Sequence, residues 1–156
     1  MIWLKFVLGG LIIAFCTLLG WVASGKYRAR KSFFMQLSAL NDKYLAELKF
    51  ARKPISQFLS ENHFVGDFEK YIQEFSKHRS VDTNYNYLSR EERDYISEYF
   101  SMLGKGDSHS QNSYFSAQVE TLLDKKSAYE KEAKSRSELY LKLGLISGLA
   151  FVILIV

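Results

Sequence analysis

The side chains that most often perform catalysis or bind metals are scattered along this 156-residue chain. The three histidines, His63, His78 and His109, have no cysteine, histidine or acidic partner at the spacing that metal sites use. The acidic pair Glu91/Glu92 is typical of a solvent-exposed helix face. We therefore expect no catalytic, metal-binding or cofactor-binding residue, and no enzymatic activity.

Two other ligand classes also find no support in the sequence. Gly104-Lys105-Gly106 lacks the spacing of a P-loop or of a dinucleotide-binding fingerprint. The formal net charge is +4, but all acidic residues and nearly all basic residues lie together in the middle of the chain. No zinc-finger spacing or basic–aromatic repeat accompanies them, so we expect no nucleic-acid partner.

The single cysteine, Cys16, lies inside an apolar run and cannot form an intramolecular disulfide. A lipid-modified cysteine is one alternative. The large Phe15 stands directly before it, where such a site needs a small residue. We favour a small apolar residue packed in a membrane helix.

Both ends of the chain are apolar. Residues 6–23 are uncharged and are flanked by Trp3 and Trp21, as expected for a membrane span with aromatic residues at both interfaces. A cleaved signal peptide is the alternative, with Lys5 as its basic region and a cleavage site near Ser24. We favour the anchor because the apolar run is long for a signal peptide.

The second apolar run, residues 143–156, is short for a span, since such a helix rises only about 21 Å. Lys142 can extend to the interface, Tyr140 can lie there, and local bilayer thinning absorbs the mismatch. A buried helix of a soluble protein is the alternative. The absence of any polar residue after Ser147 argues against it.

Basic residues flank the inner side of both runs, whereas only Lys5 lies outside them. The positive-inside rule then places the central region in the cytoplasm and both termini outside. We predict three parts: an N-terminal transmembrane helix (1–24), a cytoplasmic helical domain (25–140) and a C-terminal transmembrane helix (141–156).

Small residues recur in both apolar runs and predict close helix–helix packing in the membrane. The candidate packing residues are Gly10, Ala14, Gly144, Ser147 and Gly148. Gly20 and Ser24 continue the same spacing in the first run.

The central region has one proline and many leucine, aromatic, glutamate and lysine residues, so we predict an all-helical antiparallel bundle. We expect the first span to continue into a long amphipathic helix, and Pro54 to begin a new one. Residues 79–87 lack a period and are predicted to be a loop. The expected apolar stripes are Phe34, Leu37, Tyr44, Leu48 and Ala51; Ile55, Phe58 and Leu59; Phe64, Phe68, Tyr71, Ile72 and Phe75; Tyr95, Ile96, Tyr99, Phe100 and Leu103; and Phe115, Val119, Leu122, Tyr129, Ala133 and Tyr140.

Two helix boundaries carry local signals. Ser89 followed by Glu92 is a capping box that opens a helix. Gly104 and Gly106 end that helix, and Asp107 can cap the next one, which we expect to run unbroken into the C-terminal span.

Three segments resemble the stage III sporulation protein AB family of endospore-forming bacteria. Residues 99–111, YFSMLGKGDSHSQ, are similar to its pattern F-G-x-x-L-G-x-S-D-x-x-x-Q, although Gly106 replaces the serine. Residues 141–156 resemble its tail S-L-G-x-x-x-G-L-x-x-V-I-L-L, and residues 54–59, PISQFL, its P-L-x-x-A-L. The chain departs from the family at residues 51–53, which replace Gly-x-Thr, and it lacks a tryptophan near residues 81–87.

The resemblance implies a membrane protein similar to the inner-membrane platform proteins of type II secretion and type IV pili. It would lie in the mother-cell membrane around the forespore, within the channel complex. Its implied partners are membrane lipid, the secretion-type ATPase stage III sporulation protein AA and other members of the complex. Homo-oligomer formation stays open.

These expectations describe a non-enzymatic platform that couples mechanically to a partner ATPase. Its candidate partner-contact or capping residues are Leu103, Gly104, Asp107 and Gln111. The alternatives are a small pore-forming or holin-like protein, and a generic two-span membrane scaffold. The pore predicts a polar face on a span, yet Thr17 and Ser147 are the only hydroxyl residues in the two runs.

Overall fold

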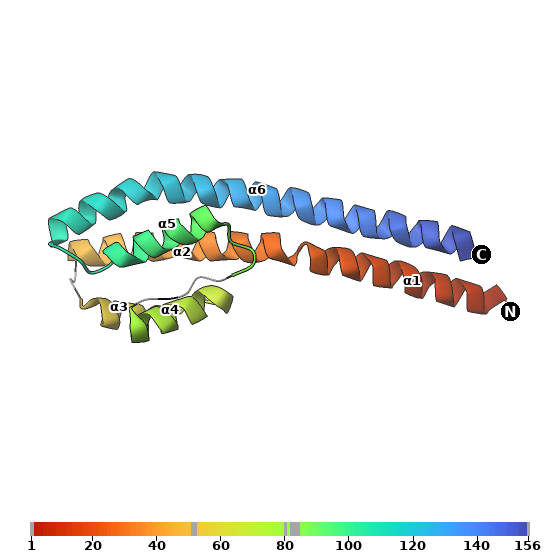
Figure 1. Cartoon of the computed structure of the whole chain (residues 1–156), viewed down its shortest axis with the longest axis horizontal. Coiled ribbons are helices and arrows are strands. Elements are labelled where there is room, and N and C mark those ends of the chain that lie inside the picture. Colours follow the sequence, from red (N-terminus) through yellow and green to blue (C-terminus); the bar gives the residue numbers. More distant parts are fainter. Residues whose placement is uncertain (1, 51–52, 80, 82–84, 156) are drawn as a thin grey trace. The chain divides into compact units, whose positions relative to one another are not determined.

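The computed structural model describes residues 2–50, 53–79, 81 and 85–155, and these residues form helices and connecting turns without a β-strand (Figure 1). The expected all-α fold, with a long apolar helix near each chain end, is confirmed. The helices are α1 (Ile2–Ala23), α2 (Gly25–Phe50), α3 (Ile55–Glu61), α4 (Gly66–His78), α5 (Arg90–Met102) and α6 (Ser108–Ile155).

The chain forms two compact units. The first contains residues 1–28 and 129–156, and the second contains residues 29–128. The predicted run of the last helix from Ser108 to the C-terminal apolar segment is confirmed, since α6 is unbroken and contributes to both units. The predicted domains 1–24, 25–140 and 141–156 follow hydropathy rather than compactness and stay a prediction.

The expected continuity of the first apolar helix into the next one is wrong at a single residue. α1 ends at Ala23 and α2 begins at Gly25, with Ser24 in a turn between them. The Trp21 carbonyl accepts hydrogen bonds from Ser24 Oγ at 2.8 Å and from Arg28 Nη2 at 2.9 Å. Side-chain donors that bond to a helix carbonyl in this way bend or interrupt the helix.

In the second unit, α2 is covered on two sides (Figure 1). The Phe33 ring meets Phe68 of α4 edge-on, with centroids 4.9 Å apart. Asn41 of the same helix bonds to the Phe115 carbonyl of α6. The stripe predicted from the sequence included Phe34 but not the adjacent Phe33. Phe33 is buried as well, because α4 covers a second face of α2. The fully buried large side chains of this unit are Phe33, Phe34, Leu37, Leu40, Asn41, Phe68, Tyr71, Ile96, Tyr99, Phe100, Phe115 and Leu122.

The stripe expected on α6 is wrong at Val119, which is 38% exposed. Gln118 is in contact instead, because its Oε1 accepts a hydrogen bond of 2.7 Å from the Tyr95 hydroxyl on α5. Ala51 of the α2 stripe, and residues 80 and 82–84 of the predicted loop, lie outside the described part of the chain.

Local signals place the ends of α3, α4 and α5. Pro54 immediately precedes α3, and its carbonyl accepts the first helical bond. α4 has acidic residues in its first turn and basic residues in its last, which suits the helix dipole. The loop before α4 is tied to α2 by Gln36, whose side chain accepts from the Val65 amide at 2.6 Å and donates to the Val65 carbonyl at 3.0 Å.

The predicted capping box at the start of α5 is confirmed, and it has a second role. Ser89 Oγ accepts from the Glu92 amide, and Glu92 Oε2 accepts from the Ser89 amide. The other carboxylate oxygen of Glu92 lies 2.7 Å from Arg30 Nη2 and 2.8 Å from Arg30 Nε. The expected solvent-exposed face at Glu91/Glu92 is therefore wrong for Glu92, which is buried because its carboxylate joins the start of α5 to α2, while Glu91 is exposed.

Replacing Glu92 with alanine is expected to cost about 3 kcal/mol of unfolding free energy, because it removes the cap and leaves a partly buried guanidinium without this partner. The neighbouring exposed Glu91→Ala is the matched control and should change stability by less than about 0.5 kcal/mol. Chemical unfolding of the detergent-solubilised chain, followed by circular dichroism, measures both. Equal losses in the two variants would contradict the structural role of Glu92.

Candidate functional site

The turn formed by residues 103–111 joins α5 to α6 and holds all four candidate contact residues of the central domain. Leu103 is the C-cap residue directly after α5 and is buried. Gly104 and Gly106 have φ angles of +78° and +84°, in the left-handed region that glycine adopts without strain. A Cβ at Gly104 would also lie 3.4 Å from the Ile55 side chain. The two glycines therefore allow the chain to reverse direction within a few residues.

Asp107 caps α6, as the sequence predicts. Its Oδ1 accepts a hydrogen bond of 3.3 Å from the Ser110 amide, and its carbonyl accepts from the Gln111 amide at 3.1 Å. A hydrogen bond with the Ser110 side chain is the main reason that the pKa of Asp107 lies below its usual value, and the Ser110 amide adds to it. The carboxylate stays exposed and ionised at neutral pH, so it can serve as a cap and face a partner at once.

Gln111 faces the interior of the second unit. Its Nε2 donates to the Lys105 carbonyl at 2.9 Å, and its Oε1 accepts from the Tyr44 hydroxyl. Burial raises the pKa of Tyr44, and a hydrogen bond with the Gly104 backbone opposes this shift. The Gln111 side chain therefore fixes the turn against α2.

Asn41 is a structural residue that the sequence analysis did not single out. It is 1% exposed, its Nδ2 donates to the Phe115 carbonyl at 3.1 Å, and its Oδ1 accepts from the Tyr99 hydroxyl at 3.0 Å. Burial raises the pKa of Tyr99 well above its usual value, so this phenol stays protonated and donates. One signal was available, since Asn41 lies four residues after Leu37 and three before Tyr44, on the apolar stripe.

The charged or titratable side chains of the 103–111 turn are exposed, and they are Lys105, Asp107 and His109. Leu103 and Gln111 are buried, and Gly104 has no side chain. A protein that binds this turn would therefore meet two basic or titratable groups around one carboxylate.

In the first unit, small residues do allow α1 and α6 to approach closely. A Cβ at Gly144 would lie 2.6 Å from the Cys16 carbonyl oxygen, and one at Gly148 would lie 2.9 Å from the Ile13 Cα. Gly9 meets Val152 across the same contact, so the two helices run antiparallel here. Glycine at these positions is what permits backbone-to-backbone contact.

The other three candidate packing residues lie away from this contact, which corrects that part of the sequence analysis. A Cβ at Gly10 would point into open space, with no atom of α6 within 4 Å, and Ala14 and Ser147 are exposed. The contact on α1 runs through Gly9, the backbone at Ile13, Cys16 and Gly20, where an added Cβ would meet the Tyr140 carbonyl of α6. The sequence prediction that Gly20 lies in the contact is therefore confirmed. Adjacent residues point about 100° apart around a helix. The expected spacing of small residues was therefore right, but Gly10 and Ala14 lie on a different face of α1 from Gly9.

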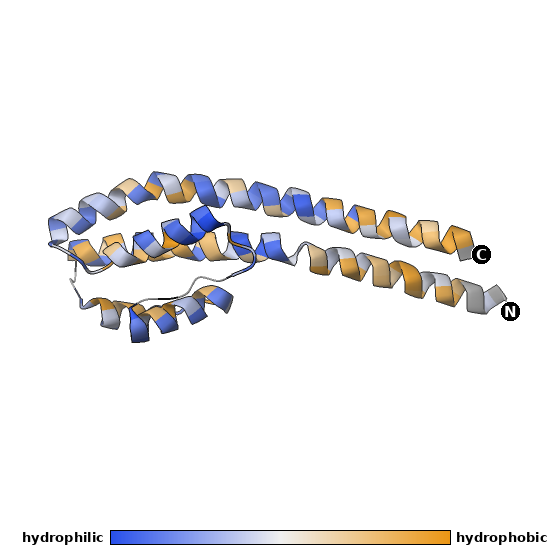
Figure 2. Cartoon of the chain, viewed as in Figure 1, coloured by the Kyte–Doolittle hydropathy of each residue, from blue (hydrophilic) through white to orange (hydrophobic). Residues whose placement is uncertain are grey.

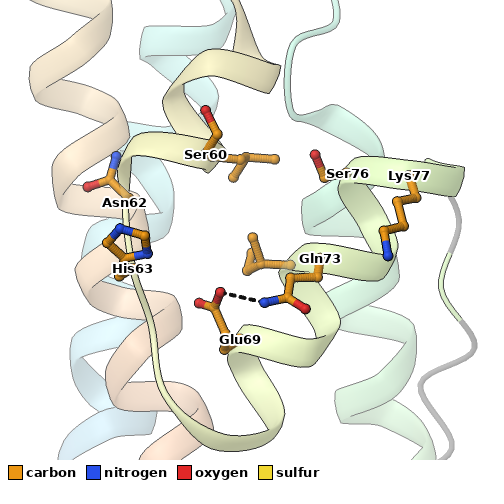
Figure 3. Close-up of a pocket in the computed structure, with 9 residues that line it drawn as sticks. Ser60, Asn62, His63, Glu69, Gln73, Ser76 and Lys77 are labelled. Carbon is orange, nitrogen blue, oxygen red and sulfur yellow. Dashed lines mark hydrogen bonds between the residues drawn. The ribbon is translucent and has the colours of Figure 1, made fainter.

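A pocket of about 310 Å³ lies between α3 and α4, with Leu59 and Ile72 among its lining residues (Figure 3). Glu69 is the acidic residue of its lining, and its carboxylate accepts from Gln73 Nε2 at 2.9 Å and from the Phe64 amide at 2.8 Å. These bonds, the Gln73 bond foremost, lower the pKa of Glu69. Through its bond to the Phe64 amide, the Glu69 carboxylate fixes the loop before α4 to the first turn of that helix. The remaining polar lining residues are Ser60, Asn62, His63, Ser76 and Lys77.

Within the described residues, no group of three or more histidine, cysteine or acidic side chains is arranged to hold a metal ion. The features that stand out are instead two long apolar helical stretches, within Phe6–Phe50 and Ser108–Leu154, which are long and apolar enough to cross a membrane. Figure 2 shows the hydrophobic residues concentrated in α1 and in the C-terminal part of α6.

This organisation matches one protein family along nearly the whole chain, since residues 5–156 match the family described as stage III sporulation protein AB. The chain belongs to this family. A role in sporulation follows from that membership, and together with the two apolar stretches it indicates a membrane protein of spore-forming bacteria. No curated protein and no solved structure matches the chain significantly.

Replacing Asn41 with alanine is expected to lower the unfolding free energy by about 2 kcal/mol or more, because the buried Tyr99 hydroxyl loses its acceptor. The adjacent exposed Asp42→Ala is the control, for which a change within about 0.5 kcal/mol is expected. Urea unfolding of the solubilised chain tests this pair. Similar stability of both variants would show that the Asn41 hydrogen bonds do not hold α2 in place.

The close contact in the first unit predicts an engineered cross-link. A Cβ at position 148 would lie 3.4 Å from the Cys16 Cβ, near the separation found in disulfides. Gly148→Cys should therefore form an intramolecular disulfide with Cys16 under mild oxidation, after a small outward shift that relieves the contact with Ile13. Ser147→Cys, one residue away and exposed, should form none.

Mobility on non-reducing gels and mass spectrometry of linked peptides distinguish the two variants. A cross-link in the Ser147→Cys chain but not in the Gly148→Cys chain would contradict the assigned α6 face. Disulfide-linked dimers in place of the internal bond would show that two copies of the chain meet through this face.

Proposed function

We propose that this family member is a non-enzymatic membrane platform in a secretion-like complex that endospore formation requires. It would be anchored by α1 and by the apolar end of α6 in the mother-cell membrane around the forespore, with its helical domain in the cytoplasm. Its partner there would be the secretion-type ATPase stage III sporulation protein AA, together with other members of the complex.

The continuity of α6 is the observation that carries this proposal. This single 48-residue helix begins at Ser108, in the exposed turn of the helical domain, and ends at Ile155 in the apolar stretch. A force applied at the turn therefore has an unbroken hydrogen-bonded path toward the membrane segment. Mechanical coupling of this kind needs no catalytic residue in the chain itself.

The 103–111 turn is the proposed contact with the ATPase. Lys105, Asp107 and His109 are exposed there, and Asp107 is already held in place by its bond to Ser110. A preorganised charged turn loses little conformational freedom when a partner binds. Leu103 and Gln111 support it from inside the domain.

The hydrogen bonding of Thr17 favours anchoring over pore formation. Thr17 Oγ1 donates to the Ile13 carbonyl at 2.8 Å, so its hydroxyl is satisfied within α1. Among the described side chains of the same helix, the exposed ones are apolar and include Phe15, Leu18 and Leu19. A surface of this kind suits lipid contact better than a water-filled path.

Asp107→Asn tests the contact, because asparagine caps helices as well as aspartate does but carries no charge. Co-purification of the ATPase with the full chain from sporulating cells should fall several-fold in this variant, while its melting temperature should stay close to the wild-type value. Glu120→Gln, which removes an exposed charge further along α6, should alter neither measurement. Unchanged co-purification in Asp107→Asn would reduce the carboxylate to a helix cap.

The proposed contact with the ATPase also requires that the helical domain lie in the cytoplasm. A Lys77→Cys variant should react with a membrane-impermeant maleimide only after cell lysis, because the exposed Lys77 would lie in the cytoplasm. Labelling of intact cells would place the domain outside and exclude a cytoplasmic ATPase as its partner.

A further inference from the structure

Three aromatic residues of the first unit lie where its apolar stretches end. Trp21 belongs to the last turn of α1, Tyr27 to the start of α2, and Tyr140 to α6. The Tyr27 and Tyr140 rings have centroids 6.1 Å apart. Tyrosine and tryptophan at such a position are typical of the headgroup region of a bilayer.

Basic side chains are packed against these rings. The Arg28 guanidinium lies 4.2 Å from the Trp21 ring centroid and also donates to the Trp21 carbonyl. Lys26 Nζ lies 5.0 Å and the Arg136 guanidinium 5.7 Å from the centroid of Tyr27. We call Lys26, Arg28 and Arg136, with their three aromatic partners, the aromatic–basic collar.

The collar gathers three basic side chains at the end of the apolar stretch. In the described part of the chain, none of its three basic side chains forms an ion pair with an acidic residue. This holds for Arg136 although acidic residues lie near it along α6. Like charges held close together repel one another, so such a cluster favours binding of an anion.

We propose that the aromatic–basic collar binds the phosphate of an anionic phospholipid headgroup. This inference rests on the proposed membrane anchoring. A phospholipid fits both parts of the surface, because exposed Leu18, Val22 and Leu143 continue from the collar and can contact acyl chains. Free phosphate would meet the basic groups but leave this apolar surface in water.

Arg28 is the residue best prepared to hold the phosphate. Stacking on Trp21 and the bond to the Trp21 carbonyl fix the plane of its guanidinium, while most of its five N–H donors remain for a ligand. A fixed planar fork suits two oxygens of one phosphate. Lys26 and Arg136 add charge from α2 and α6.

Native mass spectrometry of the full chain, released from phosphatidylcholine nanodiscs with a minor fraction of phosphatidylglycerol, measures this binding. The wild-type chain should retain phosphatidylglycerol in excess of its share of the bilayer. Each basic residue near an anionic surface contributes about fivefold to binding, so Arg28→Gln/Arg136→Gln should lower the excess by at least about tenfold.

Lys49→Gln/Lys77→Gln removes the same charge from exposed positions in the second unit and is the matched control. It should keep the wild-type excess. Retention of the two lipids by the wild-type chain in proportion to their shares of the bilayer would overturn the collar proposal without reference to any variant. An unchanged excess in Arg28→Gln/Arg136→Gln would overturn it as well.

The same preparation separates this inference from the proposed anchoring. A chain that incorporates into nanodiscs but shows no lipid preference is an anchored protein without a collar site. A chain that fails to incorporate into nanodiscs refutes the anchoring, and the collar proposal with it.

Discussion

Asn41 makes the hydrogen bonds on which the arrangement of the second unit depends. The core around it is largely aromatic, and ring contacts tolerate small rotations and shifts of helices. The buried Asn41 amide accepts a hydrogen bond from the Tyr99 hydroxyl and donates one to the Phe115 carbonyl. These two bonds do not tolerate such shifts, because both partners must stay within bonding distance. They fix α2 against α5 and α6 together, and the Tyr44–Gln111 bond repeats this one turn further on.

That fixed register explains the form of the 103–111 turn. Gln111 is held by Tyr44 on one side and by the Lys105 carbonyl on the other, so the turn has a defined conformation before any partner arrives. Asp107 then starts α6 while remaining exposed. The same residues thus support the fold and present a charged surface, and mutations there must be assessed for stability and for binding separately.

The first unit depends on a different constraint. Its helices meet through glycines, with Gly144 and Gly148 against the backbone of α1, and no buried polar network resembling that of Asn41 is present among its described residues. Where the apolar stretch ends, Lys26 and Arg136 pack against the Tyr27 ring. Lipid contact and close backbone packing would then occupy different faces of the same stretch of α1, with charged headgroup contact at its end.

The sequence by itself determined the helices and several of their ends, because apolar period and capping are local properties. The Ser89–Glu92 box, the cap at Asp107 and the apolar chain ends all follow from residues close together in the chain. Tertiary structure decided which helix face is covered. Phe33 is buried because α4 covers a second face of α2, and Gly9 rather than Gly10 meets α6. A spacing rule gives the period of a helix face but not its phase, which depends on the helix that packs against it.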